Sequence, residues 1–209
     1  HLDFALVWLI RLTLVALLLM PLIYSSSTVY PFVVGKALYS RALIEIAFAL
    51  WILLVLRRPE YRPGRSWLTL VFSLFVIATL ISALFGVSFQ RSIWSNWERM
   101  QGVWDLFHWL LFLVLLLSVV KGFRQWRILF SLNLVVGLLI TLLGVYETNG
   151  WQWSTFQFLD GNNVNRMIGS MGNSVYTGAY GMAMAITAMG LFANLFKNQI
   201  LPANPRSTQ

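Results

Sequence analysis

The chain has 209 residues, of which 58% are hydrophobic and only 11% are charged, and its formal net charge is +8. This composition is typical of a membrane protein, and the lack of cysteine excludes disulfides, thiolate nucleophiles and cysteine-bound metals. Two histidines are too few for a histidine-rich metal site, and the basic residues gather in short loops, so we expect no metal, no cofactor and no nucleic-acid partner.

Six apolar stretches are long enough to cross a hydrocarbon core about 30 Å thick. In chain order they cover about residues 3–24, 36–56, 67–87, 103–120, 125–146 and 175–196. The first is longer than a signal-peptide core and has no basic leader region or small-residue cleavage site, so we expect it to be retained. The sequence therefore predicts an all-α, polytopic transmembrane helical bundle of about six spans, with residues 1–209 forming a single transmembrane domain.

The lysines and arginines between the spans predict the orientation of the bundle. The loop between the second and third spans contains Arg57, Arg58, Arg62 and Arg65, and further basic residues follow the fourth and sixth spans. Under the positive-inside rule these three regions are cytoplasmic, together with the N-terminus. The loop before the fourth span and the long loop at 147–173 then lie on the outer face.

Two pairs of polar residues interrupt the apolar stretches. Arg41 and Glu45 are four residues apart in the second span, so on a helix they can pair with each other, either as a structural ion pair or as the polar lining of a cavity. Asp105 and His108 are three residues apart at the outer end of the fourth span. They are either an interfacial polar pair or a carboxylate that orients an imidazole base.

Three arginines, Arg91, Arg99 and Arg166, lie in the predicted outer loops. Guanidinium groups match phosphate oxygens in a bidentate geometry and stay charged, so converging arginines can hold a diphosphate at the membrane surface. Gly169 and Gly172 allow the backbone to approach such a group, next to the N-terminus of the sixth span. The alternative is that the arginines bind lipid head groups or anchor the interface.

Two of these segments resemble motifs of the O-antigen ligase/polymerase family of bacterial membrane proteins. Residues 85–102 read FGVSFQRSIWSNWERMQG, similar to that family's stretch of Ser, Trp, Glu-Arg and Gly before a span. Residues 166–173 read RMIGSMGN, similar to the family's Arg-x-x-Gly-Thr-x-Gly-Asn-Pro motif. Ser170 replaces the usual Thr, and Ser174 stands where Pro is usual. The order of the spans agrees over nearly the whole chain.

The resemblance implies a metal-independent glycosyltransferase of the multi-span C type in the bacterial inner membrane, acting in cell-envelope and lipopolysaccharide biosynthesis. Such enzymes transfer a glycan from an undecaprenyl-diphosphate carrier to lipid A core, to another glycan or to a protein at the periplasmic face. The resemblance implies that Arg166, together with Arg99 and Arg91, contacts the diphosphate, and that Gly169, Gly172 and Asn173 support this contact. His108 does not match the position of the family's histidine, so no catalytic base is assigned.

The resemblance covers the N-terminal half of such a ligase, so we expect the chain to need the remainder of a longer protein for activity. Two alternatives stay open. One is a membrane transporter, since some relatives of this family carry a bicarbonate-transporter label and the buried Arg41 and Glu45 can line a path. The other is a non-catalytic fragment.

Overall fold

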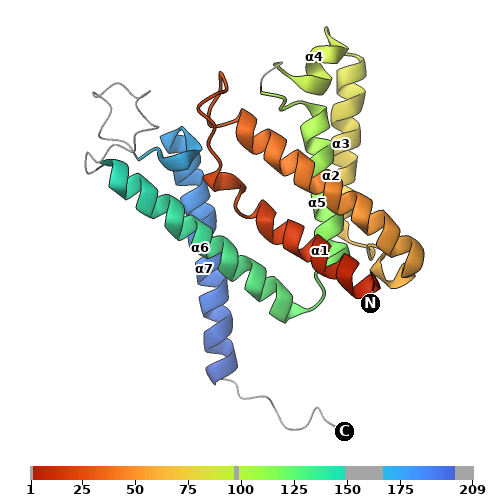
Figure 1. The fold of residues 1–209 in the computed structure, drawn as a ribbon, viewed down its shortest axis with the longest axis vertical. Coiled ribbons are helices and arrows are strands. Elements are labelled where there is room, and N and C mark those ends of the chain that lie inside the picture. The colour runs from red at the N-terminus through yellow and green to blue at the C-terminus, as the bar shows by residue number, and fades with distance from the viewer. Residues whose placement is uncertain (1, 97–98, 149–166, 201–209) are drawn as a thin grey trace. The chain divides into compact units, whose positions relative to one another are not determined.

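The computed structural model describes residues 2–96, 99–148 and 167–200, and the regular structure within them is entirely helical (Figure 1). Contacts group the chain into two compact units, residues 1–126 and residues 127–209, within the stretch that the sequence predicts to be one transmembrane domain. The two units are described separately below.

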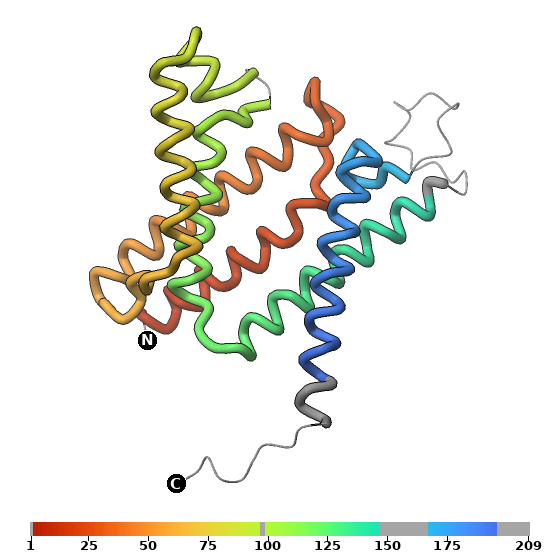
Figure 2. The backbone as a smooth tube through the Cα atoms, turned by 180° about the vertical axis from the view of Figure 1, so that it is seen from behind, coloured from red at the N-terminus to blue at the C-terminus, as the bar shows by residue number. Residues whose placement is uncertain are grey.

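The first unit is a bundle built around its last full helix. Its helices are α1 (Leu2–Leu17), α2 (Val34–Arg57), α3 (Trp67–Leu84), α4 (Phe89–Trp94) and α5 (Val103–Val119). Helix α5 contacts each of the other four, and α1 also packs along α2 (Figures 1 and 2). Residues of α1, α2 and α5 therefore form most of the interior of this unit.

The first unit is apolar both in its core and on its outer surface. Ile10, Ile44 and Leu115, one from each of the three inner helices, are completely buried. In α3, by contrast, Trp67 and Leu68 are 82% and 62% exposed. An apolar surface of this kind is costly in water and favourable in lipid.

The second unit contains most of α6 (Phe123–Thr148), the short 3-10 turn η3 (Gly169–Met171) and α7 (Ser174–Ile200). Helices α6 and α7 make close contact where Gly137 lies under Met184, since a Cβ on Gly137 would be 2.7 Å from the Met184 Cγ. Nearby, the Tyr180 hydroxyl donates a hydrogen bond of 3.2 Å to the Asn133 Oδ1. Small residues and polar pairs are the usual contacts between helices in lipid.

Four of the described helices are long and apolar enough to cross a membrane, and the chain is therefore a helical membrane protein. These segments are Val34–Arg57, Trp67–Leu84, Phe123–Tyr146 and Ser174–Leu195. Helix α5 is a shorter apolar helix of 17 residues. Helix α1 ends at Leu17, before the predicted end of the first span, because Pro21 cannot continue an α-helix and forms a 3-10 turn instead.

The start of α1 is tied to the end of α2. The Asp3 carboxylate accepts hydrogen bonds from the Nε of Arg57 at 2.6 Å and from the Nε of Arg58 at 2.8 Å. Hydrogen bonding to Asp3 raises the pKa of Arg58 above its ordinary value, so Arg58 stays charged. Two of the four arginines in the predicted cytoplasmic loop thus have a structural role.

Candidate functional site

The segment between α3 and α5, residues 85–102, is called the arginine loop here because it carries Arg91 and Arg99. It contains a short helix, α4, that the sequence reading did not predict. Ser88 is the N-cap of α4, and its Oγ accepts a hydrogen bond of 3.4 Å from the Arg91 backbone N–H. Serine is a preferred N-cap residue, so this start signal was available in the sequence.

The backbone between α4 and α5 has an unusual conformation at two residues and a close contact at a third. Ser95 and Met100 have φ angles of 69° and 53°, a left-handed region that side chains other than glycine rarely adopt. Gly102, just before α5, has the Ile93 carbonyl so close that an added Cβ would collide with it. The backbone of the arginine loop therefore packs back on itself and depends on a glycine at position 102.

Arg41 of α2 contacts the arginine loop from the interior of the first unit. Its Nη2 donates to the Met100 carbonyl oxygen and lies 3.1 Å from the Asp105 Oδ1, and its guanidinium carbon lies 5.5 Å from the centre of the Trp94 ring. Only 6% of Arg41 is exposed. Arg41 thus joins the end of α4, the last turn of the loop and the first turn of α5, which makes it a positioning residue for the loop.

The polar pairs form between helices, which differs from the pairing expected along each helix. Arg41 pairs with Asp105, and the His108 Nε2 lies 3.0 Å from the Glu45 Oε1. On each helix the two polar residues are one turn apart, so the two residues on α2 can each face one of the two residues on α5. The expected pairing of Arg41 with Glu45, and of Asp105 with His108, is therefore replaced by two cross-helix pairs.

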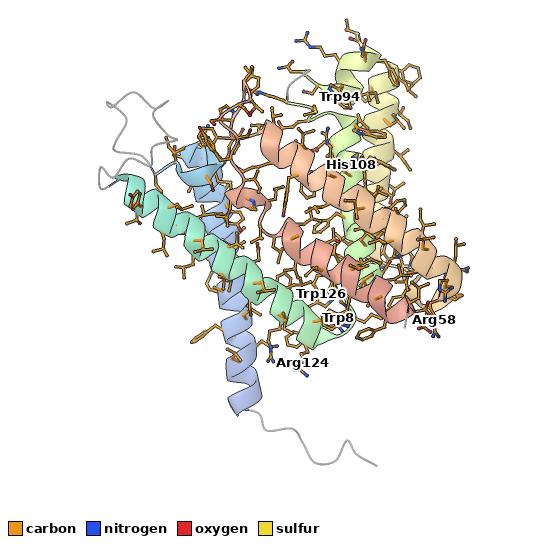
Figure 3. The ribbon with its side chains drawn as sticks, in the orientation of Figure 1. Trp8, Arg58, Trp94, His108, Arg124 and Trp126 are labelled. Carbon is orange, nitrogen blue, oxygen red and sulfur yellow. The ribbon has the colours of Figure 1, made fainter. Side chains whose placement is uncertain are left out.

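His108 is buried, and both nitrogens of its ring have a partner. Figure 3 labels His108 and Trp94 in the first unit. Its Nδ1 lies 2.8 Å from the Trp104 carbonyl oxygen, and the Trp104 and Phe107 rings lie edge-on against it. Only 3% of the His108 side chain is exposed, whereas 61% of the Glu45 side chain is exposed. The pair joins a buried imidazole to an accessible carboxylate.

The two described arginines of the arginine loop are both exposed. The Arg99 guanidinium stacks over Tyr30, at 4.8 Å from its guanidinium carbon to the ring centre. Tyr30 lies in the connection between α1 and α2, so Arg99 is supported by a second segment that is distant in the sequence. Stacking leaves the edges of the guanidinium plane available for hydrogen bonds, which is the geometry that suits a phosphate.

The second motif lies in the second unit, and Arg166 itself falls outside the described residues. Gly169 and Gly172 both have positive φ angles, of 54° and 75°, which explains why glycine stands at each position. The Asn173 Oδ1 accepts a hydrogen bond of 2.9 Å from the Val175 backbone N–H and so caps α7. These three residues shape the entry to α7, and their predicted support of a diphosphate stays a prediction.

Sequence reasoning missed two aromatic partners of the arginines. Trp94, which stacks on Arg41, was interpreted only as an interface residue, and Tyr30, which stacks on Arg99, was given no role. The Met100 carbonyl has no sequence signal, since backbone acceptors are decided by the fold. Within the described part of the chain, no three His, Cys, Asp or Glu residues gather as a metal site.

Comparison of the chain with protein-family models, with curated proteins and with solved structures found no match. The case for a function therefore rests on the residues and contacts described above.

Proposed function

We propose that the chain is part of an O-antigen-ligase-like glycosyltransferase of the bacterial inner membrane, built from six spans with a cytoplasmic N-terminus. It binds a glycan carried on undecaprenyl diphosphate and transfers it to an acceptor hydroxyl of lipid A core, of a glycan or of a protein. The arginine loop then faces the periplasm, where the diphosphate of the carrier lies at the membrane surface.

One observation carries this proposal: Arg91 and Arg99 are exposed on a loop that buried contacts hold in place. A loop fixed by Arg41 and Trp94 can present guanidinium groups without losing much conformational freedom on binding, which favours affinity. Arg99 is also supported by Tyr30. A pair of exposed cations at the outer end of apolar helices is suited to a ligand with a charged head and a lipid tail.

The proposed reaction needs the charge of a leaving group to be stabilised. The acceptor oxygen forms a bond to the anomeric carbon while the bond from that carbon to the diphosphate oxygen breaks, and the acceptor loses its hydroxyl proton. Negative charge then develops on the diphosphate, and arginines placed beside it lower the barrier. Arg91, Arg99 and Arg166 are assigned this task, and the base that takes the proton is not assigned.

Binding of undecaprenyl diphosphate to the purified chain in phosphatidylcholine nanodiscs tests the proposal. We expect Arg99→Ala and Arg91→Ala each to weaken binding by about tenfold, which corresponds to about 1.4 kcal/mol. The matched control is Arg62→Ala, an exposed arginine in the loop predicted to be cytoplasmic. Binding that is equally weak in all three variants, or that anionic phosphatidylglycerol displaces as well as undecaprenyl diphosphate does, would overturn the proposal in favour of general lipid attraction.

Two further outcomes separate the alternatives. If the chain does not bind the carrier but proteoliposomes containing it take up bicarbonate, the transporter alternative is correct. If neither activity is found, either the chain is a non-catalytic fragment or its site needs the remainder of a longer protein.

A further inference from the structure

The hydrogen bonds around His108 determine how many protons the Glu45–His108 pair holds. The Trp104 carbonyl oxygen can only accept, so the His108 Nδ1, at 2.8 Å from it, carries a proton. In a neutral imidazole the Nε2 is then an acceptor, yet it lies 3.0 Å from the Glu45 Oε1, which is also an acceptor when ionised. A hydrogen bond between these atoms requires one additional proton, on either the nitrogen or the oxygen.

The surroundings of the pair favour this one-proton state. The Arg41–Asp105 ion pair lies one helical turn away and is neutral in sum. With one shared proton, Glu45 and His108 are also neutral in sum, whether as imidazolium and carboxylate or as imidazole and carboxylic acid. Removing that proton leaves a net negative charge, and adding a second leaves a net positive charge, between apolar helices where either is costly.

Other charged and titratable groups lie on the elements packed around the pair. The charged or titratable side chains on the elements packed around the pair are Lys36, Tyr39, Arg41 and Arg57 on α2, Asp105 on α5, Asp3 and Arg11 on α1, Arg91 on α4, and Glu60 and Tyr61 on η2 (Pro59–Tyr61), with none on α3. Arg11 is bound to the Val119 carbonyl and to Gln125 at the opposite end of α5. Asp3 binds Arg57, likewise at the far end of α2.

We propose that Glu45 and His108 form a proton-binding site between α2 and α5, which holds one proton shared between the carboxylate and the imidazole. The His108 side chain is buried and the Glu45 side chain is 61% exposed, and the two share the contact of 3.0 Å between Nε2 and Oε1. Loss of the proton sets two acceptors against each other at 3.0 Å, which weakens the contact of the helices one turn below the Arg41–Asp105 pair. This inference does not depend on the proposed glycosyltransferase activity.

The protonation of His108 can be observed directly, because His1 is the only other histidine in the sequence. We would record nitrogen NMR spectra of the full chain, labelled with ¹⁵N-histidine, in nanodiscs in a His1→Gln background. We expect a protonated Nδ1 and a hydrogen-bonded Nε2, and on titration we expect the imidazole signals and the infrared carboxyl band of Glu45 to change together. A His108 with its proton on Nε2 and a bare Nδ1 would overturn the proposal, and this requires no variant.

Variants then test the role of the carboxylate. In Glu45→Gln the amide N–H of the new side chain can donate to the His108 Nε2, so we expect the neutral Nδ1–H imidazole to persist through the pH at which the wild type titrates. Glu60→Gln is the matched control, since Glu60 is an exposed glutamate in η2, beyond the end of α2, and it should titrate as the wild type does. A Glu45→Gln protein that titrates unchanged would show that His108 binds its proton alone and would overturn the shared site.

Discussion

Arg41 on α2 and Asp105 on α5 lie 3.1 Å apart in the first unit, and this pair connects the interior of the helix bundle with the arginine loop. Asp105 also accepts a hydrogen bond of 3.0 Å from the Trp109 Nε1, so both of its oxygens are used. Because Arg41 additionally reaches the Met100 carbonyl, movement of the arginine loop is coupled to the packing of α2 against α5. A contact inside the bundle thus helps to hold the loop that carries Arg91 and Arg99.

Arg41→Gln should release the arginine loop. Removing one partner of a buried ion pair leaves the other charge uncompensated, at a cost of about 3–5 kcal/mol, and the partial exposure of Asp105 favours the lower end of that range. Since the chain has no cysteine, a single Asn96→Cys in the loop reports its accessibility to a maleimide reagent. We expect faster labelling in Arg41→Gln than in the parent.

The labelling rate of Asn96→Cys should change less in two comparison proteins. Asp105→Asn keeps an acceptor for Arg41, so its effect should be smaller than that of Arg41→Gln. Glu60→Gln, at an exposed site outside the bundle interior, should label at the parent rate. Equal rates in Arg41→Gln and the parent would mean that Arg41 does not hold the loop.

The helices could be predicted from the sequence to a large extent, because lipid imposes a simple rule. Long apolar stretches must form helices to satisfy their backbone hydrogen bonds, and α2, α3, α6 and α7 lie where such stretches were expected. Helix α1 is shorter than predicted because Pro21 interrupts the first apolar stretch, and hydropathy alone does not report this.

The pairing of the site residues was not predictable in the same way. Arg41, Glu45, Asp105 and His108 were identified by their cost in an apolar environment, which is a property of each residue alone. Which of them pair depends on how α2 and α5 face each other, and a sequence pattern only reports neighbours along one helix. The left-handed backbone at Met100, which directs its carbonyl to Arg41, has no signal in residue type at all.

Gly102→Ala should distort the arginine loop. The added Cβ would collide with the Ile93 carbonyl and lie 2.7 Å from the Ser92 carbonyl oxygen, and backbone atoms cannot move aside as a flexible side chain can. We expect a loss of about 1–3 kcal/mol in the free energy of unfolding, together with faster labelling of Asn96→Cys. Gly64→Ala, where the added Cβ has no neighbour within 4 Å, is the control. A Gly102→Ala protein as stable as Gly64→Ala would contradict the packing described here.

The predicted orientation can be tested with single cysteines on the two sides of α3. Gly64→Cys lies before α3 and Asn96→Cys follows it, so if α3 crosses the membrane the two labels are on opposite faces. Because four arginines precede α3 and two follow it in the arginine loop, we expect Asn96→Cys to react with an impermeant maleimide in intact spheroplasts and Gly64→Cys to react only after lysis. The reverse pattern would invert the topology and place the arginine loop in the cytoplasm.

Gly137→Ala tests how closely α6 and α7 pack in the second unit. Gly137 is buried, and a Cβ there would lie 2.7 Å from the Met184 Cγ and 3.2 Å from its sulfur, so the Met184 side chain has to move. The same movement would disturb the contact between the Asn133 Nδ2 and the Met184 sulfur. We expect a destabilisation of about 1–3 kcal/mol from overpacking, measured by denaturation in detergent. Gly178→Ala, exposed on α7 with no atom near its added Cβ, should be neutral or slightly stabilising. If both alanines have the same effect, α6 and α7 are not in close contact at Gly137.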